Sequence, residues 1–231
     1  MSMFTKLPVA CPNCGTENQI DIFQSVNADR RPDLKAAILE GGFQVCTCTN
    51  CAAEYRPDPD FNYLDGKAGL WVSARPIPAL ANWDQEILKA SDDFALAYGD
   101  RAGQAAREIG RGLKARITFG WPAVREKIVI ADAGLDDVAV EAVKLVILQS
   151  RAGNILEEGV ELRLIQADDE RLTFGWIDVA SNDIRQSFAA QRALHDAVRD
   201  GEDWAETRAG LSGDIFVDIQ RNFIVPEPAG A

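Results

Sequence analysis

Two Cys-x-x-Cys pairs constrain this chain more than any other feature of its sequence. Cys11-Pro-Asn-Cys14 lies near the start, and Cys48-Thr-Asn-Cys51 follows after 33 intervening residues. Thiolates at this spacing converge on one metal ion, and four of them form the closed tetrahedral site typical of structural zinc. We therefore predict one structural Zn²⁺ ion bound by Cys11, Cys14, Cys48 and Cys51.

Two disulfides or a redox-active Cys-x-x-Cys are the alternative interpretations of these cysteines. All five cysteines fall within the first 51 residues, so nothing downstream is crosslinked. Such clustering is typical of metal ligation in a reducing compartment rather than of a distributed disulfide framework. A redox motif normally stands alone at the start of a helix, but here two pairs occur. We therefore favour the metal site and expect a cytoplasmic protein.

Cys46 offers a competing ligand, because it lies two residues before Cys48. Cys48 and Cys51 reproduce the spacing of the first pair, so we prefer them as ligands. Cys46 is then expected to be a small buried apolar residue on the strand that enters the second pair.

Local patterns around the cysteines predict a zinc-ribbon-like, β-rich segment with an inserted helix. Gly15 suits the sharp reversal after the first pair, since glycine accepts positive φ. Pro32 suits the first turn of a helix that Gly41-Gly42 ends. We expect strands at 7–15, 19–23 and 43–45, a hairpin at 60–64 and 69–72, and a stiff extended exit at 76–79. That exit divides the chain into a zinc-ribbon-like segment at 1–80 and an acidic α+β unit at 81–231.

The second unit is expected to mix helices with antiparallel strands, so the predicted fold class is α+β. A buried helix should follow Gly134-Leu-Asp-Asp, capped by Asp136 or its neighbour. The other expected elements are a helix capped by Asn82 or Asp84, helices at 104–113 and 186–198, a hairpin at 160–165 and 172–177, and a strand at 215–219. Residues 116–124 and 171–179 share six of nine positions, and we interpret them as two similar strands rather than a duplication.

The cysteine pairs, together with several downstream segments, resemble the bacterial CpXC proteins. The matching segments are Cys11-Pro-Asn-Cys14-Gly, Ser25-Val-Asn, Pro32-Asp-Leu-Lys, Cys48-x-x-Cys51, Tyr63-Leu-Asp, Arg125-Glu-Lys-Ile128 and Gly134-Leu-Asp-Asp-Val138. The resemblance covers residues 7 to 150 and implies paired cysteine motifs but no established activity. Thr49 stands where this family usually has proline, and Ala52 where it has glycine. Both departures touch the turn and leave the ligands in place.

The charge balance limits the partners that this chain is expected to bind. Its formal net charge is −12, with −2 in residues 1–80 and −10 in residues 81–231. A surface this acidic repels phosphate backbones and anionic lipids, and this repulsion disfavours binding to nucleic acids and membranes. No run of residues approaches the roughly 18 apolar residues needed to span a bilayer. We therefore expect a protein partner, no nucleic acid and no membrane.

The sequence marks no catalytic residues. His195 is the only histidine, and its neighbours predict an exposed or partly packed side chain rather than a ligand. No activated nucleophile or phosphate-binding glycine motif is present. The leading hypothesis is a non-enzymatic protein-interaction or scaffold module with a structural zinc site. The alternative is an enzyme of unrecognised type that uses carboxylates in a cleft between the two units.

Overall fold

A five-stranded mixed sheet forms the N-terminal part of the protein. The computed structural model describes residues 2–150, 157 and 159–223. The strands lie in the order β1-β2-β5-β6-β7, with the β1–β2 and β5–β6 pairs antiparallel and the β2–β5 and β6–β7 pairs parallel. Their bounds are β1 (Met3–Ala10), β2 (Glu17–Asn27), β5 (Phe61–Asp65), β6 (Leu70–Arg75) and β7 (Lys114–Phe119).

A second, antiparallel sheet follows and completes the predicted α+β class. Its strands are β8 (Val160–Ala167), β9 (Arg171–Asp178) and β10 (Ile184–Gln191), in the order β10-β9-β8. A third pair, β3 (Cys46–Thr47) and β4 (Glu54–Tyr55), is a short hairpin. Strand β7 lies beyond the predicted boundary at residue 80 and yet pairs with β6, so one sheet joins the two predicted units. The domain division itself stays a prediction.

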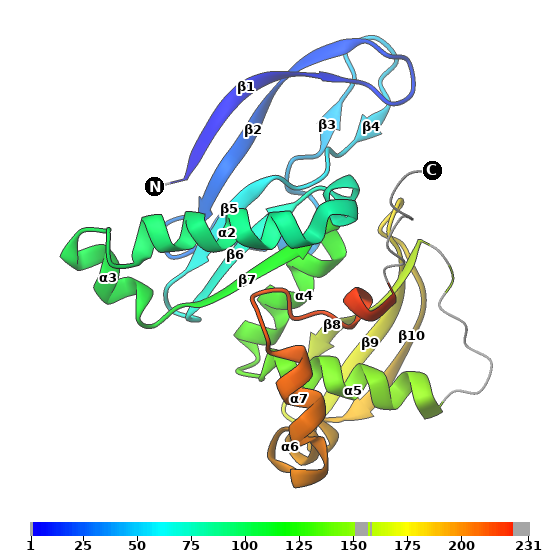
Figure 1. The fold of residues 1–231 in the computed structure, drawn as a ribbon. Coiled ribbons are helices and arrows are strands. Elements are labelled where there is room, and N and C mark those ends of the chain that lie inside the picture. Colours follow the sequence, from blue (N-terminus) through cyan, green and yellow to red (C-terminus); the bar gives the residue numbers. More distant parts are fainter. Residues whose placement is uncertain (1, 151–156, 158, 224–231) are drawn as a thin grey trace, which may run out of the picture.

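Helices cover both sheets (Figure 1). Helix α1 (Pro32–Glu40) and helix α4 (Gly120–Asp132) pack on one face of the first sheet, and α2 (Trp83–Tyr98) packs on the other. Helix α5 (Asp137–Ser150) packs on the second sheet. The remaining helices are α3 (Gln104–Gly110), α6 (Arg192–Asp200), α7 (Ala205–Leu211) and the 3₁₀ turns η1 (Ile77–Asn82), η2 (Glu202–Trp204) and η3 (Ile219–Phe223). No helix in the described part of the chain is long and apolar enough to cross a bilayer.

Several predicted elements are confirmed, because local signals specify them. Helix α1 begins at Pro32 and ends before Gly41, whose φ of 82° is the left-handed cap that glycine accepts. The predicted hairpins correspond to β5–β6 and β8–β9. Helix α5 is capped as expected, because the carboxylate of Asp136 accepts a hydrogen bond from the amide of Ala139 at 2.9 Å.

Several predictions of local structure are wrong, and tertiary contacts explain two of them. Residues 184–191 form strand β10 instead of the first part of a helix, since Phe188 there stacks on Phe174 of β9 at 6.0 Å. Residues 215–219 form no strand, because buried side chains bind their backbone. Residues 77–82 form η1 where an extended exit was expected at 76–79. Residues 43–45 contain a turn instead of the predicted strand, which begins at Cys46.

His195 is buried, which corrects the expectation of an exposed or partly packed side chain. Only 1% of its surface is accessible. Its Nε2 atom lies 3.1 Å from the amide nitrogen of Asp136, and its Nδ1 atom lies 3.1 Å from the Asp196 carboxylate. The imidazole therefore ties α6 to the start of α5, a contact between elements distant in sequence.

The two similar nine-residue segments adopt different structures. In the first, β7 ends at Phe119 and α4 begins at Gly120, whose φ of 78° reverses the chain. The second remains in strand β9 through Asp178. The expectation of two similar strands is therefore wrong for the second half of the first copy, where Pro122 fits the first turn of a helix.

Helix α4 lies between the two sheets and is buried along most of its length. Trp121, Val124 and Ile128 enter the core beneath the first sheet, while Ile130 enters the core of the second. Because α4 contributes to both cores, it links the two sheets.

Charged side chains are buried beside α4. Glu126 accepts hydrogen bonds from Lys144 at 2.8 Å, from Arg163 at 2.9 Å and from the amide of Leu164 at 2.6 Å. Lys144 also donates to Glu141 at 2.9 Å. Buried charges are tolerated only when opposite charges and hydrogen bonds compensate for lost hydration. The network therefore fixes how α4, α5 and β8 meet.

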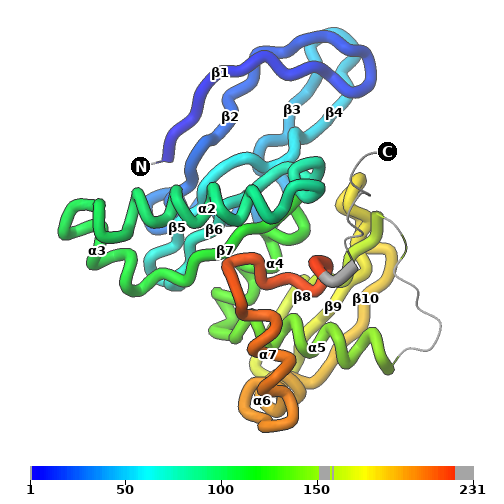
Figure 2. Tube along the Cα trace, in the orientation of Figure 1, coloured from blue at the N-terminus to red at the C-terminus, as the bar shows by residue number. Residues whose placement is uncertain are grey.

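The segment after α7 enters this network and runs between the two sheets (Figure 2). Lys127 donates to the carbonyl of Val217 at 2.6 Å, and the amide of Ile219 donates to Glu141 at 3.1 Å. Asp218 pairs with Arg163 at 2.5 Å. Burial alone would raise the pKa of Asp218, but the surrounding cations, Arg163 first, lower that pKa to about 2. These side-chain contacts explain why residues 215–219 are not a strand.

Replacing Lys144 with methionine should destabilise the protein. Lys144→Met leaves Glu126 and Glu141 without the cation they share, so we expect a loss of about 3–5 kcal/mol in the free energy of unfolding. Urea denaturation measures it. Lys89→Met is the control, since Lys89 is exposed and a surface pair contributes only about 0–1 kcal/mol. Equal effects of the two substitutions would contradict the role given to the buried network.

Candidate metal centre

The turns of two hairpins carry the four cysteines. Cys11 follows β1 directly and Cys14 lies before β2, while Cys48 follows β3 and Cys51 lies before β4. Figure 1 shows the two turns at the same end of the molecule, away from the second sheet. The sequence pattern thus places each pair in a tight reversal, and the fold brings the two reversals together.

The four sulfur atoms lie close to one another. All four are within 4.8 Å of each other, with Cys11 Sγ 3.7 Å from Cys51 Sγ and Cys14 Sγ 3.6 Å from Cys48 Sγ. Sulfurs bound at about 2.3 Å around one tetrahedral zinc ion would lie roughly 3.8 Å apart. The separations exceed the roughly 2.05 Å of a disulfide bond. This arrangement could hold one metal ion.

The two competing cysteines at the second pair differ in their surroundings. Cys48, and not Cys46, belongs to the four-sulfur cluster. The thiol of Cys46 instead donates to the carbonyl of Gln44 at 3.3 Å, and its side chain is half-buried. Burial raises the pKa of the Cys46 thiol, as expected for a packed cysteine.

The two turns have matching backbone hydrogen bonds. The amide of Gly15 donates to the carbonyl of Cys11 at 2.8 Å, and the amide of Ala52 donates to the carbonyl of Cys48 at 3.0 Å. Both Gly15 and Ala52 have positive φ, 72° and 57°. Ala52 therefore holds a left-handed conformation that its Cβ makes unfavourable.

Asparagine side chains cross between the two turns. Asn13 donates to Cys51 Sγ at 3.5 Å, and Asn50 donates to Cys14 Sγ at 3.7 Å, so each turn supports a sulfur of the other. The pKa of the Cys14 thiol falls to about 6, chiefly through hydrogen bonds with Thr16 and also through Asn50. Backbone amides of Cys51 and Asn50 lower the pKa of Cys48. These donors favour the thiolate form that metal ligands require.

The side chain of Asn18 makes hydrogen bonds to both turns. Its side-chain amide donates to the carbonyl of Thr16 at 2.9 Å and to Cys48 Sγ at 3.6 Å. Its side-chain oxygen accepts from the amide and the hydroxyl of Thr49, at 2.9 and 2.8 Å. A proline at position 49 could make neither bond. The sequence offered no pattern that singles out Asn18.

The environment of Cys11 favours the neutral thiol unless a cation is near. Its side chain is buried, and burial raises the pKa of its thiol to about 11. A thiolate there is stable only when a nearby positive charge replaces the lost hydration. A bound divalent cation supplies that charge and deprotonates coordinating thiols. The donor set, four sulfurs and no oxygen or nitrogen, is typical of zinc or an iron–sulfur cluster.

The comparisons with known proteins agree with the cysteine pattern. The family model described as CpXC protein matches residues 9–144, more than half of the chain. The chain belongs to the CpXC family. The match confirms the resemblance and extends from the cysteine turns through α4 into α5. Searches of curated proteins and of solved structures returned no match.

Replacing Ala52 with glycine should stabilise the metal-loaded protein. Glycine adopts positive φ without the Cβ clash, so Ala52→Gly should raise the free energy of unfolding by about 1 kcal/mol. The reciprocal change, Gly15→Ala, should lower it by a similar amount, because nothing lies within 4 Å of the added Cβ and only backbone strain acts. Urea denaturation measures both. A destabilising Ala52→Gly would show that the turn does not hold this conformation.

Proposed function

We propose that Cys11, Cys14, Cys48 and Cys51 bind one structural Zn²⁺ ion. Sulfur separations of 3.6 and 3.7 Å, close to those of a tetrahedral zinc–thiolate site, carry this proposal. The four protein ligands fill the coordination sphere, so no position remains for a substrate or a catalytic water. Zinc here would stabilise structure.

The hairpin of β1 and β2 is the part of the protein that needs such a site. Only residues Ser25–Asn27 of β2 pair with β5, so the rest of the hairpin leaves the sheet. An isolated two-stranded hairpin is marginally stable in water. Phe23 gives some support, through its ring 5.2 Å from Phe43 and its amide bonded to Gln44 at 2.7 Å. A metal ion bound by the β1–β2 turn and the β3–β4 turn would hold the end of the β1–β2 hairpin that is farthest from β5.

We infer that the protein is a non-enzymatic interaction module. The β1–β2 hairpin is the surface best suited to bind another protein. Strand β1 is at the edge of its sheet, and no described strand pairs with its outer side. It exposes Met3, Phe4 and Leu7, at 55, 57 and 42% of their surfaces. An extended apolar segment of a partner could add to this edge by backbone hydrogen bonds. Lys6 and Pro8 are residues that protect edge strands from unspecific pairing.

The charge of the protein supports a protein partner over nucleic acid or membrane. With a net charge of −12, long-range repulsion opposes binding to phosphate backbones and anionic lipids.

The alternative, a carboxylate enzyme acting in a cleft between the two units, has less support. Among the described residues, Asp132 is the one carboxylate that lines the pocket between α4 and β8, and it pairs with Lys35.

Freshly purified, reduced protein should contain about one zinc ion per chain by elemental analysis. Cys14→Ser should abolish that zinc and increase hydrogen exchange in β1 and β2, since the metal would hold their turn. Cys46→Ser is the matched control and should keep its zinc, because Cys46 lies outside the cluster. Zinc-free wild-type protein, or loss of zinc from Cys46→Ser, would overturn the proposed site.

Affinity capture with the full chain should recover a stable protein partner that Leu7→Glu loses. A charge at position 7 makes burial of the β1 edge unfavourable. Leu88→Glu on α2 is the control, because Leu88 is 67% exposed and lies far from β1 in the sequence. In the recovered complex, hydrogen exchange should slow in β1. Capture of no partner, or equal capture by both variants, would contradict the interaction module.

A further inference from the structure

A pocket lies between the two sheets, apart from the metal centre. Its volume is about 360 Å³, and its walls come from α1, α4, β8 and β9. This volume is in the range of small-molecule sites. Neither the proposed zinc site nor the β1 edge uses it.

Most of the pocket wall is apolar. Eight of the twelve lining residues are aliphatic or proline. The larger of them are Leu39, Pro122, Val129, Leu164, Ile165 and Ile177. Such a wall favours a ligand with an apolar body, because burial there removes apolar surface from water.

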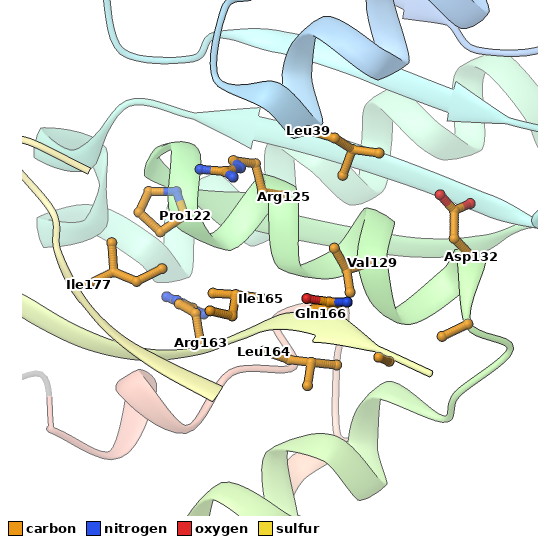
Figure 3. A pocket seen from close by; sticks show the side chains of 12 residues that line it. Leu39, Pro122, Arg125, Val129, Asp132, Arg163, Leu164, Ile165, Gln166 and Ile177 are labelled. Carbon is orange, nitrogen blue, oxygen red and sulfur yellow. The ribbon is translucent and has the colours of Figure 1, made fainter. Parts of the chain in front are cut away.

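The polar side chains differ between the ends of the pocket (Figure 3). Arg125 lies beside Pro122 at one end, and Asp132 lies at the other. Two of the polar groups already have partners. Asp132 pairs with Lys35, and Arg163 pairs with carboxylates that include Glu161 at 2.6 Å.

Arg125 has no such partner. Every other half-buried or buried lysine and arginine in the described part of the chain makes a hydrogen bond or an ion pair. Arg125 makes none, although its side chain is half-buried. Burial lowers its pKa, and it repels Arg56, whose guanidinium donates to the carbonyl of Gly41 at 2.8 Å. A buried cation without a counterion is unfavourable, so an anion at this position would be stabilised.

We propose that this pocket binds a small carboxylate with an apolar body, whose carboxylate pairs with the guanidinium of Arg125. The planar guanidinium donates two parallel hydrogen bonds that match the two oxygens of a carboxylate. Leu164 and Ile177 from the second sheet and Val129 from α4 then contact the apolar body. A phosphate dianion fits less well, because one unpaired guanidinium matches one charge and Asp132 lies in the same wall.

Sodium octanoate is a suitable probe for the zinc-loaded full chain. In a titration followed by methyl NMR, octanoate should saturate and shift the signals of Val129, Leu164 and Ile177. Octan-1-ol has the same chain without the charge, and should bind at least about tenfold more weakly, since charged hydrogen bonds contribute more than 1.4 kcal/mol. Acetate has the charge without the chain and should not saturate.

Arg125→Gln should weaken octanoate binding at least about tenfold and leave octan-1-ol binding unchanged. Arg111→Gln is the matched control, because Arg111 is exposed and makes no side-chain bond in the described structure, so its removal changes the net charge equally. That variant should bind octanoate as the wild type does. Equal binding of octanoate and octan-1-ol to the wild type, unchanged octanoate affinity in Arg125→Gln, or shifts confined to other residues would overturn the proposal. So would the absence of octanoate binding.

Discussion

The convergence of four sulfurs at the ends of two hairpins is the constraint on which the N-terminal half depends. Only three residues of the β1–β2 hairpin pair with β5. The rest of the sheet therefore holds the hairpin at one end and leaves its turn unsupported. At the other end the chain places a buried thiol, Cys11, within 3.7 Å of Cys51. Four thiolates this close repel one another unless a cation lies between them. One bound metal ion would therefore both neutralise the repulsion between the thiolates and stabilise the hairpin.

Side chains and backbone of both turns surround the four sulfurs. Where the family pattern has proline, Thr49 keeps an amide and a hydroxyl, and both bind the buried Asn18. Where the pattern has glycine, Ala52 adopts a left-handed conformation. The second turn thus has two hydrogen bonds to Asn18 and one residue, Ala52, in an unfavourable backbone conformation. The cross-turn donors Asn13 and Asn50 keep the same Cys-x-Asn-Cys position in both pairs.

Features that short-range patterns encode could be predicted from the sequence. The two cysteine turns, the start and end of α1, the cap of α5 and the hairpins all follow from neighbouring residues. Features that depend on distant contacts could not. Strand β10 exists because Phe188 meets Phe174, and residues 215–219 lose their strand because Lys127 and Glu141 bind their backbone. His195 is buried by its contact with Asp136, 59 residues away, and Arg125 is identifiable only by the partners that it lacks.

Helix α4 connects the two halves of the molecule, since it enters both cores and carries Glu126 and Lys127 in the buried charge network. The four-cysteine cluster stands apart from that network, and a metal ion bound there would hold the hairpin that leaves the sheet. X-ray absorption at the zinc edge of the reduced, full-length protein tests this account most directly. We predict four sulfur neighbours at about 2.3 Å. A shell containing oxygen or nitrogen ligands, or fewer than four sulfurs, would contradict a closed structural site.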